Sequence, residues 1–140
     1  MPDRPYEFFE HTADVGLRAH GATLPELFHH AAQGLTVLLV EDSPIQPTET
    51  RPMTLHAASV DALLRLWLSD LLFWCMTERF LYAGAEFQTL TATDLYATVS
   101  GERYDPARHA QGTEIKGITY HQLAVRHAAA GWDAKLILDV

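Results

Sequence analysis

The sequence has 140 residues, 48% of them hydrophobic and 20% charged, and its formal net charge is −8 at pH 7 with the histidines neutral. This length and composition predict one globular domain over residues 1–140, and no apolar run is long enough to cross a bilayer. The ten Lys and Arg residues are scattered along the chain, so direct binding to a nucleic-acid backbone is not expected, and any nucleic-acid role would run through a basic partner.

The first forty residues predict two strands and a helix. Residues 6–10 are short and rich in aromatic side chains, and residues 15–20 alternate apolar with small or polar side chains, so both segments are expected to be strands. The following Thr23-Leu24-Pro25-Glu26 has the pattern of a capping box with a proline in the first helical turn. Apolar residues then recur at helical spacing, which predicts a helix over residues 23–40.

The middle of the chain predicts a connection, a short strand and a second helix. Residues 42–52 contain three prolines and are expected to form an exposed connection into an edge strand at residues 53–57. Ser59 precedes an apolar segment that predicts a helix over residues 60–78, buried on several sides. Within this helix, Asp61 and Arg65 lie one turn apart, which favours a weak ion pair between them.

The last part of the chain has the pattern of strands, predicted over residues 81–90, 93–102, 114–126 and 132–140. Two helices followed by a run of strands indicate an α+β fold, mostly antiparallel, with the two helices packed on one face and all elements in one compact domain. The single cysteine, Cys75, and the lack of an apolar signal segment in residues 1–5 favour a cytoplasmic location.

Two carboxylates are candidates for a functional site. Asp14 lies between the first two predicted strands, and Asp139 lies at the end of the last one. If the fold brings the two ends of the chain together, these side chains form an oxygen-only site, which suits a hard divalent cation. Each aspartate is also explained as an ordinary loop or strand-end residue, and their spacing alone does not decide between these interpretations.

Residues 114–121 are a second segment of interest. On the predicted strand, Lys116 and Tyr120 share one face and His121 lies on the other, although a half-buried strand with a solvated polar face explains the same pattern. The histidines do not have the spacing of a zinc site, and there is no glycine-rich phosphate loop and no hydrolase nucleophile motif.

Four segments in chain order resemble the archease family. They are residues 9–16 (FEHTADVG), 21–28 (GATLPELF), 112–121 (GTEIKGITYH) and 138–140 (LDV). The similarity extends from about residue 6 to the end of the chain. Two positions depart from the family pattern: Glu10 stands where many relatives have Asp, and Gly117 replaces a common Ala.

The resemblance implies a metal site that joins Asp14, Asp139 and a backbone oxygen of Val140, with Ca²⁺ as the preferred ion and Mg²⁺ or Mn²⁺ as alternatives. It also implies a functional role for Lys116. His11 and Glu10, which precede the motif aspartate, are further candidates for contact with a partner, and whether Glu10 also joins the acidic cluster is left open at this point.

Archeases are not known as enzymes. The resemblance therefore implies a protein cofactor that promotes guanylylation and turnover of an RtcB-type RNA ligase in tRNA splicing and RNA repair, with RNA reached only through the ligase. Two alternatives remain at this point. One is a metal-dependent hydrolase of RNA or nucleotides, with His11 as the base, and the other is a general chaperone-like modulator.

Overall fold

The structure is a computed structural model that describes residues 5–11, 14–41 and 43–140. Its elements in chain order are β1 (Tyr6–His11), β2 (Asp14–Gly21), α1 (Leu24–Val40), β3 (Glu49–His56), α2 (Val60–Glu78), β4 (Phe80–Leu90), β5 (Asp94–Arg103), β6 (Gly117–Ile118), β7 (Ala124–Ala128) and β8 (Gly131–Asp139). No helix among the described residues is long and apolar enough to cross a membrane.

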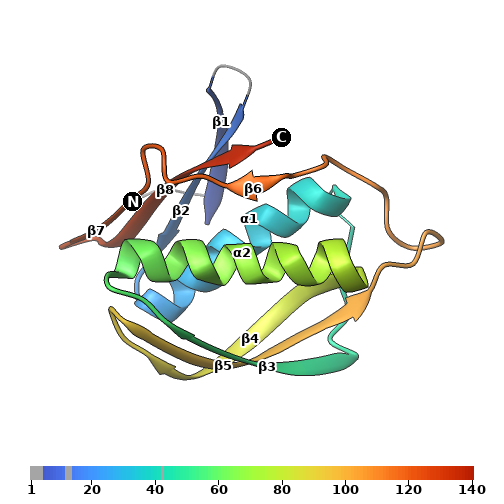
Figure 1. Cartoon of the computed structure of the whole chain (residues 1–140), viewed down its shortest axis with the longest axis horizontal. Coiled ribbons are helices and arrows are strands. Elements are labelled where there is room, and N and C mark those ends of the chain that lie inside the picture. The colour runs from blue at the N-terminus through green and yellow to red at the C-terminus, as the bar shows by residue number, and fades with distance from the viewer. Residues whose placement is uncertain (1–4, 12–13, 42) are drawn as a thin grey trace.

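The strands form two antiparallel sheets with both helices between them (Figure 1). One sheet has the order β1-β2-β8-β6, and β7 also pairs with β8, while the other has the order β3-β5-β4. The α+β class, the antiparallel pairing and the two helices are as predicted. Each sheet therefore carries the helices on one face only, and the outer face of the five-stranded sheet points away from them.

Both helices begin where the sequence predicts. The Thr23 hydroxyl accepts a hydrogen bond from the amide of Glu26 at 3.3 Å, and Ser59 caps α2 in the same way through the amide of Ala62 at 3.2 Å. The Glu26 carboxylate reaches back to the amide of Ala22, at 3.3 Å, which lies one residue before the expected partner. These caps bind amides that have no acceptor within the helix.

The core lies between the sheets around Trp67 of α2, which is fully buried. Its indole N–H donates to the main-chain oxygen of Phe28 in α1 at 2.9 Å, so the large ring is buried without an unsatisfied donor. On the other side of α1, Leu17 of β2 is fully buried beneath the helix. Burial of each such side chain contributes about 1.5–3 kcal/mol.

Two strand predictions are wrong in extent. β3 begins at Glu49 and includes Pro52, which is possible because β3 is an edge strand of its sheet. The strand expected over residues 114–126 is divided into the two-residue β6 and the separate β7. A turn that contains Gln122 at φ 55° separates β6 from β7. Lys116 precedes β6 and Tyr120 follows it, so these two residues do not share a strand face.

The segment between β5 and β6 is held by a buried cluster around Glu102. The Glu102 carboxylate accepts hydrogen bonds from the guanidinium of Arg108, from Nε2 of His109 at 3.1 Å and from the amide of Gln46 at 2.7 Å. The amide of Asp105 donates to Nδ1 of His109, so Nε2 carries the ring proton. The Arg108 guanidinium lowers the pKa of Glu102 to about 2.

Candidate metal centre

The two predicted aspartates lie at adjacent strand ends of the five-stranded sheet. β2 and β8 are antiparallel, with Val15 opposite Leu138, and the same register continued by one residue places Asp14 opposite Asp139. Residues directly opposite each other share a face, with Cβ atoms about 4.5–5.5 Å apart. The pairing of β2 with β8 therefore places these two strand ends, which are far apart in the sequence, next to each other.

Both carboxylates lie on the outer face of the sheet. Leu17 contacts α1, because a methyl group added at Gly34 of the helix would lie 2.7 Å from its Cδ1 atom. Side chains alternate between the two faces along a strand, so Asp14 points away from α1. Asp14 is half-buried and Asp139 is exposed.

The neighbouring strands β1 and β6 place two other predicted residues, His11 and Lys116, beside the two aspartates. His11 of β1 is the register partner of Asp14, and Gly117 of β6 is the partner of Asp139. Lys116, just before β6, is exposed, and its amide donates to the main-chain oxygen of Asp139 at 2.7 Å. The side chain of His11 and residues 12–13 of the motif lie outside the described residues.

Glu10 lies on the other face. It is paired with Val15, the neighbour of Asp14 along β2, so alternation directs its side chain toward the helix side of the sheet. Glu10 is therefore separated from the carboxylate pair by the sheet itself. Val140 follows Asp139, and its side chain packs against the core.

The donor set consists of oxygen atoms. Two like charges on facing strands repel each other unless they share a proton or bind a cation. In the described part of the chain, no three His, Cys, Asp or Glu side chains are grouped closely enough to hold a metal ion. A cation at Asp14 and Asp139 would therefore be completed by main-chain oxygens and water, which are usual ligands of a hard cation such as Ca²⁺.

The sequence predicted that Arg65 pairs with Asp61, but in the structure Arg65 anchors the segment next to Asp139. Arg65 of α2 donates from Nε to the main-chain oxygen of Ile118 at 2.9 Å and from Nη1 to the hydroxyl of Tyr120 at 3.1 Å. Asp61 accepts a hydrogen bond from the amide of Val125 at 3.2 Å. The predicted ion pair on the helix is therefore replaced by three hydrogen bonds with the chain around the β6–β7 turn.

A glycine permits this segment to approach the first helix. The amide of Gly112 donates to the main-chain oxygen of Leu39 at 2.9 Å, and the amide of Thr113 donates to that of Leu38 at 2.7 Å. These bonds satisfy carbonyls in the last turn of α1. A Cβ atom at Gly112 would lie 2.2 Å from the oxygen of Leu38, so a larger residue does not fit. The motif at residues 112–121 thus crosses from the end of α1 to the carboxylate pair.

The sequence model of the Archease protein family (MTH1598/TM1083) matches residues 6–140. Among curated proteins, the chain is 33% identical to Protein archease of Saccharolobus islandicus over 140 residues, covering 98% of this chain and 99% of the relative. It is 31% identical to Protein archease of Methanosarcina acetivorans over 141 residues, covering 98% and 97%.

Two solved structures have a similar fold. The solution structure of protein 1598 from Methanobacterium thermoautotrophicum superposes with a TM-score of 0.78 at 28% identity, covering 97% of this chain and 99% of that one. The crystal structure of a Thermotoga maritima archease, described as a possible chaperone, has a TM-score of 0.59 at 17% identity, covering 94% of each chain. The second likeness concerns the fold alone.

Proposed function

The chain belongs to the archease family, and on this premise we propose that it is a non-catalytic protein cofactor of an RtcB-type RNA ligase. In this role it promotes guanylylation of the ligase and sustains its turnover in tRNA splicing and RNA repair in the cytoplasm. RNA is reached only through the ligase. The observation that carries the proposal is the meeting of Asp14, Asp139 and the main chain of Lys116 at one end of the sheet.

We propose that Asp14, Asp139 and a main-chain oxygen of Val140 hold a divalent cation, with Ca²⁺ preferred in the isolated protein and Mg²⁺ or Mn²⁺ as alternatives. The two carboxylates project from neighbouring rigid strands, so little conformational entropy is lost when they bind the ion together. The bound cation supplies positive charge and open coordination positions for oxygen ligands.

The charge of the chain supports docking on a basic ligase surface. A net charge of −8 favours rapid encounter with a positively charged partner, and this attraction weakens as salt is added. Lys116 is exposed and fixed through its main chain beside Asp139, so its ammonium group is available to the ligase or to the phosphates of its nucleotide. Phosphoryl transfer depends mainly on positioning and charge neutralisation, which a docked partner can improve.

The test is a guanylylation and multiple-turnover ligation assay with the ligase of the same cell. Asp14→Asn and Asp139→Asn remove the carboxylate pair, and Asp94→Asn is the matched control because it changes an exposed aspartate at the start of a strand in the other sheet. We expect the control to stimulate fully and the two test variants to lose about tenfold or more of the stimulation.

Each other outcome has a defined meaning. Full stimulation by Asp14→Asn or Asp139→Asn would overturn the metal proposal, and no stimulation by the wild-type protein would overturn the ligase proposal. RNA hydrolysis by the protein without ligase would favour the metal-dependent hydrolase. The chaperone alternative predicts a broad exposed apolar patch. The large exposed hydrophobic side chains of the described residues come instead from four separate parts of the fold: Phe8, Phe73 and Met76, Tyr96, and Tyr120.

A further inference from the structure

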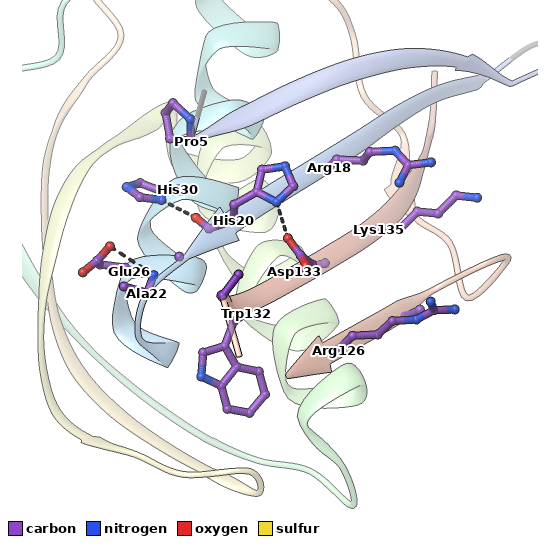
Figure 2. Close-up of a pocket in the computed structure, with 14 residues that line it drawn as sticks. Pro5, Arg18, His20, Ala22, Glu26, His30, Arg126, Trp132, Asp133 and Lys135 are labelled. Atoms are coloured by element: carbon purple, nitrogen blue, oxygen red, sulfur yellow. Dashed lines mark hydrogen bonds and ion pairs between the residues drawn. The ribbon is translucent and has the colours of Figure 1, made fainter. Parts of the chain in front are cut away.

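A cavity lies at the opposite end of β2 and β8 from the carboxylate pair, where β2 leads into α1 (Figure 2). Its volume is about 890 Å³, within the range of small-molecule sites. Three basic side chains line it: Arg18, Arg126 and Lys135. They are three of the ten Lys and Arg residues of an acidic chain, so the fold gathers cations that are scattered in the sequence.

The strand register places these three side chains on the same face. Arg18 of β2 is directly opposite Lys135 of β8, and Arg126 of β7 is opposite Asp133, two residues away from Lys135 on the same strand. Positions two residues apart share a face, so all three project from the outer face of the sheet. Figure 2 shows their side chains extending in the same direction from three neighbouring strands.

These cations have no carboxylate partner in the part of the chain that the structure describes. Arg18 and Lys135 lie over the ring of Phe9, at 5.1 Å and 5.4 Å from its centroid, and no ion pair is made by Arg126. By contrast, Arg51, Arg103 and Arg108 each form ion pairs with Asp or Glu.

The acidic side chains at the cavity are engaged elsewhere. The Asp133 carboxylate is bound to Nδ1 of His20, and Glu26 caps the start of α1 through the amide of Ala22. Neither therefore neutralises the three cations through an ion pair. Asp133 is also the register partner of Arg126, and Glu7 of β1 is that of Arg18, but among the described residues neither forms an ion pair with these cations. Three positive charges held on neighbouring strands beside one cavity attract an anion.

We propose that this cavity binds a phosphate group, carried either by a nucleotide or by an RNA strand. A terminal phosphate carries about −1.5 to −2 charges at pH 7, which matches two or three adjacent cations better than a single carboxylate does. The planar guanidinium of Arg18 or Arg126 can donate two parallel hydrogen bonds to such a group, and Lys135 adds a point charge. This inference goes beyond the proposed ligase function and does not depend on it. A nucleotide in the cavity is compatible with contact to RNA only through the ligase, whereas an RNA strand in the cavity would replace that part of the proposed function.

The cavity can be tested apart from the carboxylate pair. Arg18 lies four residues from Asp14 on the same face of β2, a separation of about 13 Å along the strand. The ring of Phe9 lies between them over Gly16, where a Cβ atom would come within 2.2 Å of it. Substitutions in the cavity therefore leave the metal ligands in place.

The experiment is a nuclear magnetic resonance and calorimetric titration of the isolated protein at low salt. The probes are inorganic phosphate, guanosine monophosphate, a 5′-phosphorylated single-stranded RNA octamer, the same RNA without the terminal phosphate, and an octaglutamate peptide. The test variant is Arg18→Gln with Lys135→Gln, and the control is Arg103→Gln, an exposed cation on the other sheet. Circular dichroism and thermal melting check that all variants are folded.

We expect the phosphate-bearing probes to shift the amide signals of residues 18, 126 and 135, with an affinity that falls about tenfold or more in the double variant and is unchanged in Arg103→Gln. Tighter binding of the phosphorylated RNA than of the mononucleotide identifies a strand as the source, and equal binding identifies the nucleotide. Binding of octaglutamate but not of phosphate would overturn the proposal. So would undetectable binding of every probe, or equal losses in the test and control variants.

Discussion

Lys116 and Asp139 are joined through their main chains, because the amide of Lys116 donates to the carbonyl oxygen of Asp139 at 2.7 Å. This bond links the start of β6 to the last residue of β8, next to the end of β2 that begins at Asp14. Lys116 and both aspartates are thus held on neighbouring backbone segments of one sheet. The following predictions test how this arrangement is maintained and what it does.

The effect of Asp139→Asn on stability should change sign with the cation. In a chelator, the substitution removes repulsion from Asp14, so the free energy of unfolding should stay the same or rise by up to about 1 kcal/mol. In millimolar Ca²⁺, the wild-type protein should gain stability by binding the ion and the variant should not. Thermal melts of both proteins in EGTA and in Ca²⁺ provide the measurement. A Ca²⁺-dependent rise in the melting temperature of the variant equal to that of wild type would contradict the prediction.

Gly112 and Gly117 should respond differently to the same substitution. Gly112→Ala puts a Cβ atom 2.2 Å from the main-chain oxygen of Leu38 and should cost about 2 kcal/mol or more, because the segment must move away from α1. Gly117→Ala is the matched control, since a Cβ atom there has nothing within 4 Å. Urea denaturation measures both. Equal losses of stability in the two variants would show that the chain at Gly112 is not packed closely against α1.

Much of the fold could be predicted from the sequence, because its signals are local. The capping residues Thr23 and Ser59 mark the two helix starts, and the alternation in residues 132–140 marks β8. The strand predicted over residues 114–126 was wrong because a turn at Gln122 interrupts a pattern that remains strand-like on both sides. The alternation of apolar and polar side chains predicts a strand on each side of the turn, but it does not show where the backbone reverses between them.

The sequence predicted only part of the candidate site, because it does not show which distant strands pair. The family resemblance pointed to Asp14 and Asp139, but only the strand register shows that β2 and β8 end side by side at these residues and that Glu10 lies on the other face. The grouping of Arg18 with Lys135 was not predictable, because Arg18 lies in β2 and Lys135 in β8, and these two strands are far apart in the sequence. Pairing between distant strands is not encoded in any short window of sequence.

Arg65 should limit local opening of the segment around Lys116. Arg65→Met removes the hydrogen bonds to Ile118 and Tyr120 and should cost about 1–2 kcal/mol, because the oxygen of Ile118 loses a charged donor. Hydrogen exchange of the Thr119 amide, which donates to Ile137 at 3.0 Å, should accelerate. Arg65→Lys should show an intermediate rate, because an ammonium group replaces only part of the guanidinium contact. Unchanged exchange in Arg65→Met would contradict the anchoring role.

The Glu102 cluster should make stability depend on acid pH. Arg108 lowers the pKa of Glu102 from 4.5 to about 2, so this carboxylate stabilises the fold fully above about pH 4.5 and loses that contribution as the pH falls toward 2. Arg108→Gln should lower the free energy of unfolding at pH 7 and flatten its decline between pH 4.5 and 2, because the Glu102 carboxylate loses its charged donor. Chemical denaturation at several pH values measures this.

The control for the acid prediction is Arg103→Gln. Arg103 is exposed and its ion pairs with Glu49 and Glu78 are long, at 3.5 Å and 3.9 Å, so its loss should change stability by less than about 0.5 kcal/mol. An unchanged pH profile in Arg108→Gln would assign the lowered pKa of Glu102 to its other partners, His109 and the amide of Gln46.

The measurement that tests the central claim most directly is a double-mutant cycle on ligase stimulation with Asp14→Asn, Asp139→Asn and the two combined. If the two carboxylates hold one cation, either substitution alone removes the site, and the double variant should be no more impaired than each single variant. If the losses instead multiply, the two aspartates act independently, and the account of one shared metal centre is contradicted.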